Sequence, residues 1–146
     1  MEMFPEASEC VVKVASSGLD KEELVRKIIA LNEKGDVVQL FDPKQVRGGT
    51  HLVGAYVNAL NAFNEKTSIS KNVATEMLLF AAMTRQINDA IKKMGIKSTK
   101  DFVVFASSEE AYRKAKKLFT DEKKFVSKND GDTDVLREMA VARLSG

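Results

Sequence analysis

The sequence predicts an α+β fold, a small mixed β-sheet of three to four strands covered by helices, with a central helical block. Three observations support this class. Short β-branched or apolar runs typical of strands flank the middle of the chain, the middle itself has helical periodicity, and the two patterns do not alternate regularly. The 146 residues are 44% hydrophobic, which is enough for one core. We therefore expect a single domain over residues 1–146.

The first third of the chain is predicted to fold as strand, helix, strand. Residues 10–15 are β-branched and place Lys13 between apolar neighbours, which indicates a strand near a sheet edge. Residues 20–35 predict an amphipathic helix that begins after Asp20 as the capping residue and stops at a glycine. Residues 36–43 read as a second strand, terminated by a proline.

The middle of the chain carries two helical segments. Residues 50–64 repeat apolar side chains with a helical period. Residues 76–97 begin almost wholly apolar, become amphipathic at Arg85 and close on a glycine, so we predict a break near Thr84. The first half of this second segment should be buried on several sides, and its second half should keep an outer face.

The last third predicts a further strand and two helices. Residues 102–106 form an apolar run that should be the most buried strand, and Ser107 with Glu110 forms a capping box for the helix that follows. Residues 123–127 can add a short edge strand. Residues 132–144 carry apolar side chains at helical spacing and predict a closing helix.

Charge, cysteine content and hydropathy bound the class of protein. The formal net charge is only +2, so any nucleic-acid binding must come from a local patch. Cys10 is the single cysteine, which excludes an intramolecular disulfide and fits a reducing compartment. The longest apolar run, residues 77–83, is far shorter than the roughly 20 residues of a membrane span. We expect a cytoplasmic protein with no membrane partner.

The chain shows little that indicates catalysis. The Gly48-Gly49 turn precedes a helix start, where backbone N–H groups can receive a phosphate, but the rest of a phosphate-binding loop is missing. His51 is the only histidine, and no nucleophile–base pair or metal-ligand cluster is visible. We expect no catalytic residues, no metal and no cofactor. A small nucleotide-binding domain or enzyme that uses this turn and His51 remains the alternative.

Glu76 is unusual because it lies within an apolar helical segment. A carboxylate there must reach solvent or find a partner, and Arg85 is one candidate. Two interpretations stay open: the two residues have a structural role, or one of them contacts a ligand.

The central block, residues 42–97, resembles the small subunit of the KEOPS complex that binds the PRPK-type atypical kinase, the PRPK-binding protein family. The resemblance lies in an ordered pattern: an Asp, a glycine before His-Leu, spaced alanines, a Glu in an apolar helix, Arg-Gln-Ile and a terminal Gly-Ile. The matching positions are Asp42, Gly49, His51, Leu52, Ala55, Ala59, Glu76, Arg85, Gln86, Ile87, Ala90, Gly95 and Ile96. The family often has a small or glycine residue before Arg-Gln-Ile, whereas this chain has the sequence AMTRQI.

The resemblance implies a noncatalytic regulatory subunit. Such a subunit binds and stimulates the kinase and helps to recruit tRNA, through its single-stranded 3′ CCA end, for N6-threonylcarbamoyladenosine modification. Its indirect partner is the threonylcarbamoyl-transferase subunit of the same complex. A scaffold that binds the kinase only is a simpler alternative.

Two sets of site residues are predicted. The kinase contact is expected to be an apolar patch at the end of the second helical segment, where flexible side chains flank a helix-ending glycine. Its residues are Ile91, Met94, Gly95 and Ile96. The tRNA site is expected where the start of the first helical segment meets the Arg-Gln turn, with a lysine nearby if the two segments pack antiparallel. Its residues are His51, Lys71, Arg85 and Gln86.

Overall fold

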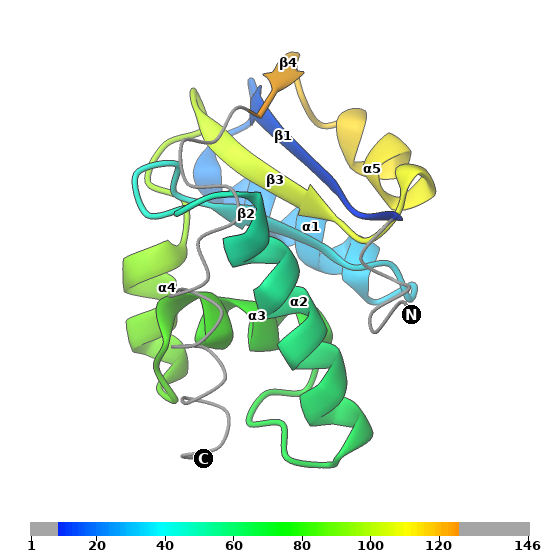
Figure 1. Cartoon of the computed structure of the whole chain (residues 1–146). Coiled ribbons are helices and arrows are strands. Elements are labelled where there is room, and N and C mark those ends of the chain that lie inside the picture. The colour runs from blue at the N-terminus through cyan, green and yellow to red at the C-terminus, as the bar shows by residue number, and fades with distance from the viewer. Residues whose placement is uncertain (1–8, 126–146) are drawn as a thin grey trace. The chain divides into compact units, whose positions relative to one another are not determined.

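The computed structural model describes residues 9–125 (Figure 1). In chain order, its elements are β1 (Val11–Ser16), α1 (Lys21–Asn32), β2 (Val38–Phe41), α2 (Gly49–Asn64), α3 (Val73–Ala82), α4 (Ile87–Met94), β3 (Phe102–Ala106), α5 (Glu109–Lys116) and β4 (Asp121–Lys124). The predicted α+β class is therefore confirmed. The predicted closing helix, residues 132–144, lies outside the described residues.

The described residues form two compact units. The first contains residues 9–44 and 96–125, and the second contains residues 45–95. The first unit holds the whole four-stranded sheet, and the second is helical. Each unit has its own internal packing, so each is described in turn.

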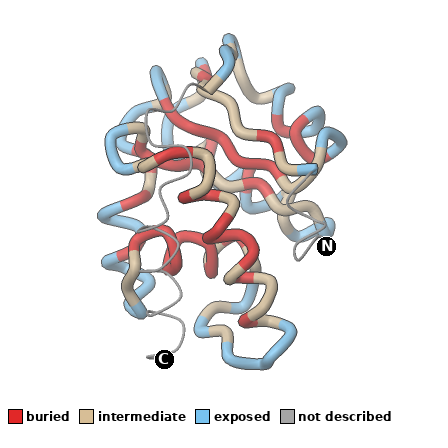
Figure 2. Tube along the Cα trace, in the orientation of Figure 1, coloured by how far each residue is buried: buried red, intermediate tan, exposed pale blue. Residues whose placement is uncertain are grey.

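The sheet of the first unit is antiparallel, with strand order β2-β3-β1-β4. All five residues of β3 are buried, which confirms that this apolar run is the most buried strand (Figure 2). β1 pairs with both β3 and β4, so it lies one strand in from the edge. The predicted short edge strand is present as β4, and it begins at Asp121 rather than at Lys123.

Helices α1 and α5 cover one face of this sheet. Their buried residues, among them Leu24 and Tyr112, share a core with alternate residues of β3, including Phe102 and Val104. The predicted cap of α1 is confirmed, because the Asp20 side chain accepts a hydrogen bond from the backbone N–H of Glu23 at 2.8 Å.

The predicted capping box of α5 is displaced by one residue. Ser108, not Ser107, accepts the hydrogen bond from the N–H of Ala111, at 3.1 Å. Ser107 directly follows β3 and still pairs with the residue before β2, because its N–H donates to the carbonyl of Val37 at 2.9 Å. The pairing of this residue with the sheet therefore decides where the helix can begin.

The second unit packs α2 against α3 and α3 against α4. Eight of the ten residues of α3 are buried, which confirms that the first half of the predicted segment is internal. The predicted break near Thr84 is also confirmed, since α3 ends at Ala82 and α4 begins at Ile87.

The end of α3 has the hydrogen bonds of a Schellman motif. The N–H of Met83 donates to the carbonyl of Phe80, and the N–H of Thr84 donates to that of Leu79, both at 3.1 Å. Met83 has a φ of 58°, a left-handed conformation in which glycine is usual. The chain thus turns sharply between α3 and α4 with a methionine in this left-handed position.

Candidate functional site

His51 joins the start of α2 to the end of α3. It lies in the first turn of α2 and is 1% exposed. Its Nδ1 accepts a hydrogen bond from the N–H of Arg47 at 2.9 Å, and its Nε2 lies 2.9 Å from the carbonyl of Ala81. These partners require the tautomer that carries its proton on Nε2. The imidazole therefore has a structural role inside the second unit.

This geometry corrects one predicted tRNA contact. The two helix ends meet as expected, because His51 bonds to Ala81 at the end of α3. A buried ring with both nitrogens engaged cannot stack on a base or donate to one, so His51 is not a surface residue of the site. The same contacts remove it as a free proton acceptor for the alternative enzyme hypothesis.

Glu76 fixes the loop between α2 and α3. Its side chain is buried, and both carboxylate oxygens lie 3.1 Å from the N–H of Ile69. Oε1 also accepts from the N–H of Ser70 at 2.8 Å and from the hydroxyl of Ser70 at 2.7 Å. The carboxylate thus faces the loop instead of Arg85. The hydrogen bonds from these donors offset the free-energy cost of removing the carboxylate from water.

Helix α4 presents an apolar pair to solvent. Ile87 is 37% exposed and Ile91 is 49% exposed. Residues four apart lie one above the other on a helix face, so these two side chains form a single strip. Ala90 and Met94, on the adjoining face, are buried and anchor α4 in the unit.

The predicted kinase-contact patch needs correction at its C-terminal end. Met94 is fully buried, and Ile96 belongs to the buried core of the first unit. Gly95 ends α4 in an extended conformation, with φ −68° and ψ 155°, rather than in the left-handed one. A Cβ at this position would lie 2.5 Å from the carbonyl oxygen of Ile91, so the close approach of the backbone explains the glycine. Ile91 is the one predicted contact whose side chain is exposed.

A polar group lies at the connection from α3 to α4. Arg85 and Gln86 are both exposed there. Lys93 of α4 donates from Nζ to the carbonyl of Ala82 at 3.4 Å, which brings its ammonium beside the same connection. Lys93 is two residues from Ile91, and such neighbours point to different sides of a helix. The apolar strip and the polar group therefore occupy different flanks of α4.

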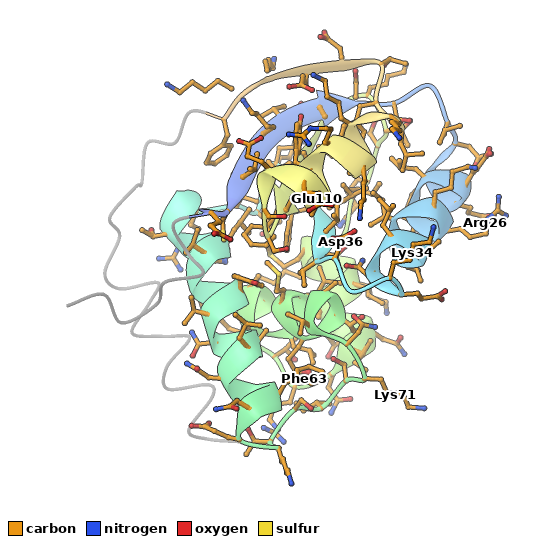
Figure 3. All side chains as sticks on the ribbon, turned by 90° about the vertical axis from the view of Figure 1, so that its right-hand side faces the viewer. Arg26, Lys34, Asp36, Phe63, Lys71 and Glu110 are labelled. Carbon is orange, nitrogen blue, oxygen red and sulfur yellow. The ribbon has the colours of Figure 1, made fainter. Side chains whose placement is uncertain are left out.

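Lys71 lies far from this group. Packing α2 against α3 places the start of α2 near the end of α3, as the His51 contact shows, whereas Lys71 precedes α3. In Figure 3 it lies near Phe63, at the C-terminal end of α2. From His51 to that end, α2 extends about 20 Å at 1.5 Å per residue. The antiparallel packing therefore separates Lys71 from Arg85, in contrast to the prediction.

A family model described as kinase binding protein CGI-121 matches residues 15–141 of the chain. The chain belongs to this family. The family resemblance found in the central block is thereby confirmed, and the CGI-121 family is described as kinase-binding. No individual curated protein matches the sequence.

For a member of the CGI-121 family, the site of interest is a surface for a protein partner. The exposed strip on α4 has that character, and the predicted patch did not include Ile87. Its spacing of four from Ile91 was the available signal. In the part of the chain that the structure describes, no helix is long and apolar enough to cross a membrane, and no three potential ligand side chains cluster as a metal site would require.

Proposed function

We propose that this CGI-121 family member is the small noncatalytic regulatory subunit of a KEOPS complex. It binds and stimulates a PRPK-type atypical kinase and helps to recruit tRNA, through the 3′ CCA end, for N6-threonylcarbamoyladenosine modification. The family match supports the kinase as partner. The resemblance of residues 42–97 to the KEOPS subunit supports the complex, the stimulation and the tRNA.

The observation that carries the kinase-binding surface is the exposed strip of Ile87 and Ile91 on α4. Large apolar side chains in the centre of an interface supply most of its binding free energy when they become fully buried. The strip is rigidly presented, because Ala90 and Met94 hold the other face of the helix in the unit. A partner that buries both isoleucines gains apolar area without first ordering the helix.

The proposed RNA contact consists of Arg85, Gln86 and Lys93. Arg85 and Lys93 supply positive charge for phosphates, and the amide of Gln86 can hydrogen-bond a base edge. The group is small, as the net charge of +2 requires. Because it lies on a different flank of α4 from the isoleucine strip, kinase and RNA can be bound together.

Titration of the purified PRPK-type kinase with the protein, followed by calorimetry, tests the kinase surface. Ile91→Asp places a carboxylate in the proposed contact and should weaken binding by at least about ten-fold. The matched control is Ile29→Asp on α1, because Ile29 is 53% exposed and lies outside the strip. It should change the affinity by less than about two-fold. Equal affinities of the wild type and a folded Ile91→Asp variant would reject this surface.

Binding of tRNA with and without its CCA end tests the RNA contact. The wild type should prefer the intact tRNA, and Arg85→Ala should reduce that preference. Lys71→Ala is the matched control, since Lys71 is an exposed cation at the opposite end of the unit. Affinity should fall with salt at a log–log slope of about −0.7 per phosphate neutralised. Equal binding of both tRNAs would exclude recognition of the CCA end.

A further inference from the structure

Lys13 of β1 and Lys124 of β4 lie directly opposite each other in the sheet. Both side chains point to the face that α1 and α5 cover, because Lys13 alternates with Val11 and Ala15, which belong to the core on that face. Like charges directly opposite each other in an antiparallel pair repel and destabilise the sheet. The lysine pair therefore has a cost in stability.

Within residues 9–125, no carboxylate forms an ion pair with either lysine. The acidic residue of β4 on the same face is Glu122, which lies opposite Ala15. Its carboxylate is already engaged, because Nζ of Lys116 on α5 lies 3.5 Å from its Oε2. The described part of the chain thus leaves two positive charges side by side without a counter-charge.

Protection of a sheet edge explains only one of the two lysines. Lysines on a terminal strand prevent pairing with another chain, and β4 is a terminal strand. Lys13 lies one strand further in, on β1 between β3 and β4, where there is no edge to protect. An anion bound from outside would offset the repulsion that Lys13 adds.

Helix α5 carries a second pair of like charges. Arg113 and Lys117 are both exposed and four residues apart, so one lies above the other on the helix. Neither forms an ion pair with another described residue, whereas Lys114 pairs with Asp36 at 3.0 Å. The helix dipole favours cations near this C-terminus, but like charges at this spacing repel each other.

The two pairs lie on neighbouring elements of the first unit, because α5 leads directly into β4 (Figure 1). The ion pair between Lys116 and Glu122 joins the last turn of α5 to β4. We call the four cations together the basic surface: Lys13, Arg113, Lys117 and Lys124.

The basic surface lacks apolar anchors. None of the large apolar side chains that are exposed in the described residues lies on β1, α5 or β4. A protein interface has apolar or aromatic residues at its centre, and a membrane-surface helix inserts such residues among the lipids. Binding to a phosphate backbone requires mainly positive charge. The basic surface therefore fits a nucleic acid better than a protein or a membrane.

We propose that the basic surface binds the phosphate backbone of tRNA, in addition to the contact formed by Arg85, Gln86 and Lys93. The inference rests on the proposed function for its RNA partner, and it gives the first unit a separate contact. Phosphate contacts position a nucleic acid without reading its bases. The basic surface should therefore bind the body of the tRNA whether or not the CCA end is present.

Lys124→Glu distinguishes this role from a structural one, because stability and RNA affinity should change in opposite directions. A glutamate opposite Lys13 replaces repulsion with attraction, so the midpoint of urea denaturation should move to a higher concentration. The same substitution removes a phosphate contact. Affinity for tRNA should fall at least about five-fold at 0.1 M salt, and the log–log salt slope should become shallower by about 0.7. Lys124→Arg keeps the charge and should keep the affinity.

Fluorescence anisotropy of the full chain with labelled tRNA, prepared with and without its CCA end, measures both affinities. Lys124→Glu should weaken binding of the two tRNAs by the same factor and leave the preference for the CCA end intact. Arg85→Ala should instead reduce that preference. The matched control is Lys71→Glu, because it changes the net charge equally at an exposed lysine of the second unit. It should lower the affinity by less than about two-fold.

Three results would overturn the proposal: an unchanged affinity of Lys124→Glu for tRNA without its CCA end, an equal loss in Lys71→Glu, or a loss of kinase affinity in place of RNA affinity. Wild-type protein that binds only the intact tRNA would reject the basic surface and retain CCA recognition. Wild-type protein that binds both tRNAs equally would exclude CCA recognition, and a loss in Lys124→Glu would then still support the basic surface.

Discussion

Replacing Glu76 with glutamine should destabilise the protein more than any comparable change at its surface. The side chain is 2% exposed, and its carboxylate accepts hydrogen bonds from three donors of the preceding loop. The donors are the backbone N–H groups of Ile69 and Ser70 and the hydroxyl of Ser70. Glutamine has nearly the same shape, so the substitution changes charge and hydrogen bonding with little change in packing.

The expected cost follows from the difference between charged and neutral hydrogen bonds. A hydrogen bond to an ionised group contributes roughly 1.5–3 kcal/mol, and a neutral one contributes roughly 0.5–1.5 kcal/mol. The loss is thus about 1 kcal/mol for each donor, or about 3 kcal/mol for the three donors around Glu76. The amide NH₂ of glutamine must also face one of these donors, which raises the cost further.

Equilibrium denaturation in urea, followed by far-ultraviolet circular dichroism, measures the effect. Glu33→Gln is the matched control, since Glu33 is exposed at the end of α1, and it should change the free energy of unfolding by less than about 0.5 kcal/mol. The amides of Ile69 and Ser70 should also exchange faster with solvent in Glu76→Gln. A loss below about 0.5 kcal/mol would show that the loop does not depend on the carboxylate.

Two further changes test the backbone and a buried hydroxyl. Lys66 is exposed and has a φ of 61°, a left-handed conformation that is strained for any residue with a Cβ. Lys66→Gly should therefore raise the free energy of unfolding by about 1 kcal/mol, whereas Lys66→Ala keeps the strain and should not. Urea denaturation of the two variants measures the difference. Burial, followed by the nearby Glu122 and Glu109 carboxylates, raises the pKa of Tyr112 above its usual value. The neutral phenol is favoured in the folded state. Its contribution to the free energy of unfolding is therefore fully present below about pH 10 and is lost as the pH rises further. Tyr112→Phe should therefore flatten the fall of stability above pH 10, and an unchanged slope would contradict this.

Much of the fold could be predicted from local sequence signals. The Asp20 cap and the wholly apolar run of β3 are set by short-range chemistry, and both were predicted correctly. The displaced cap of α5 shows the limit of such signals. Ser107 and Ser108 are equally good caps, and only pairing with Val37 across the sheet selects the second. Because Val37 and Ser107 are far apart in the sequence, local sequence signals do not show this pairing.

The candidate site could be predicted less well, because an apolar stripe does not show which of its members face a neighbouring helix. Ile87, Ala90, Ile91 and Met94 share helical spacing, and packing divides them into a buried pair and an exposed pair. Lys71 was misplaced for a related reason. The order of residues along the chain does not show which end of a helix pair they occupy.

The buried motif positions give the family signature a physical meaning. His51 joins α2 to α3, Glu76 fixes the loop between them, and Gly95 permits a close backbone approach at the end of α4. Each acts inside the second unit, so the ordered pattern specifies the architecture that presents a surface.

This distinction separates two kinds of variant. Glu76→Gln should lower the free energy of unfolding, and the fraction that remains folded should bind the kinase with normal affinity, because the carboxylate faces the loop. Ile91→Asp should leave the free energy of unfolding nearly unchanged and weaken kinase binding, since an exposed side chain contributes little to folding and can contribute much to an interface. Measuring the free energy of unfolding and the kinase affinity of both variants therefore distinguishes residues that stabilise the fold from residues that contact the kinase. A Glu76→Gln variant that binds more weakly even when fully folded would place the α2–α3 loop in the interface.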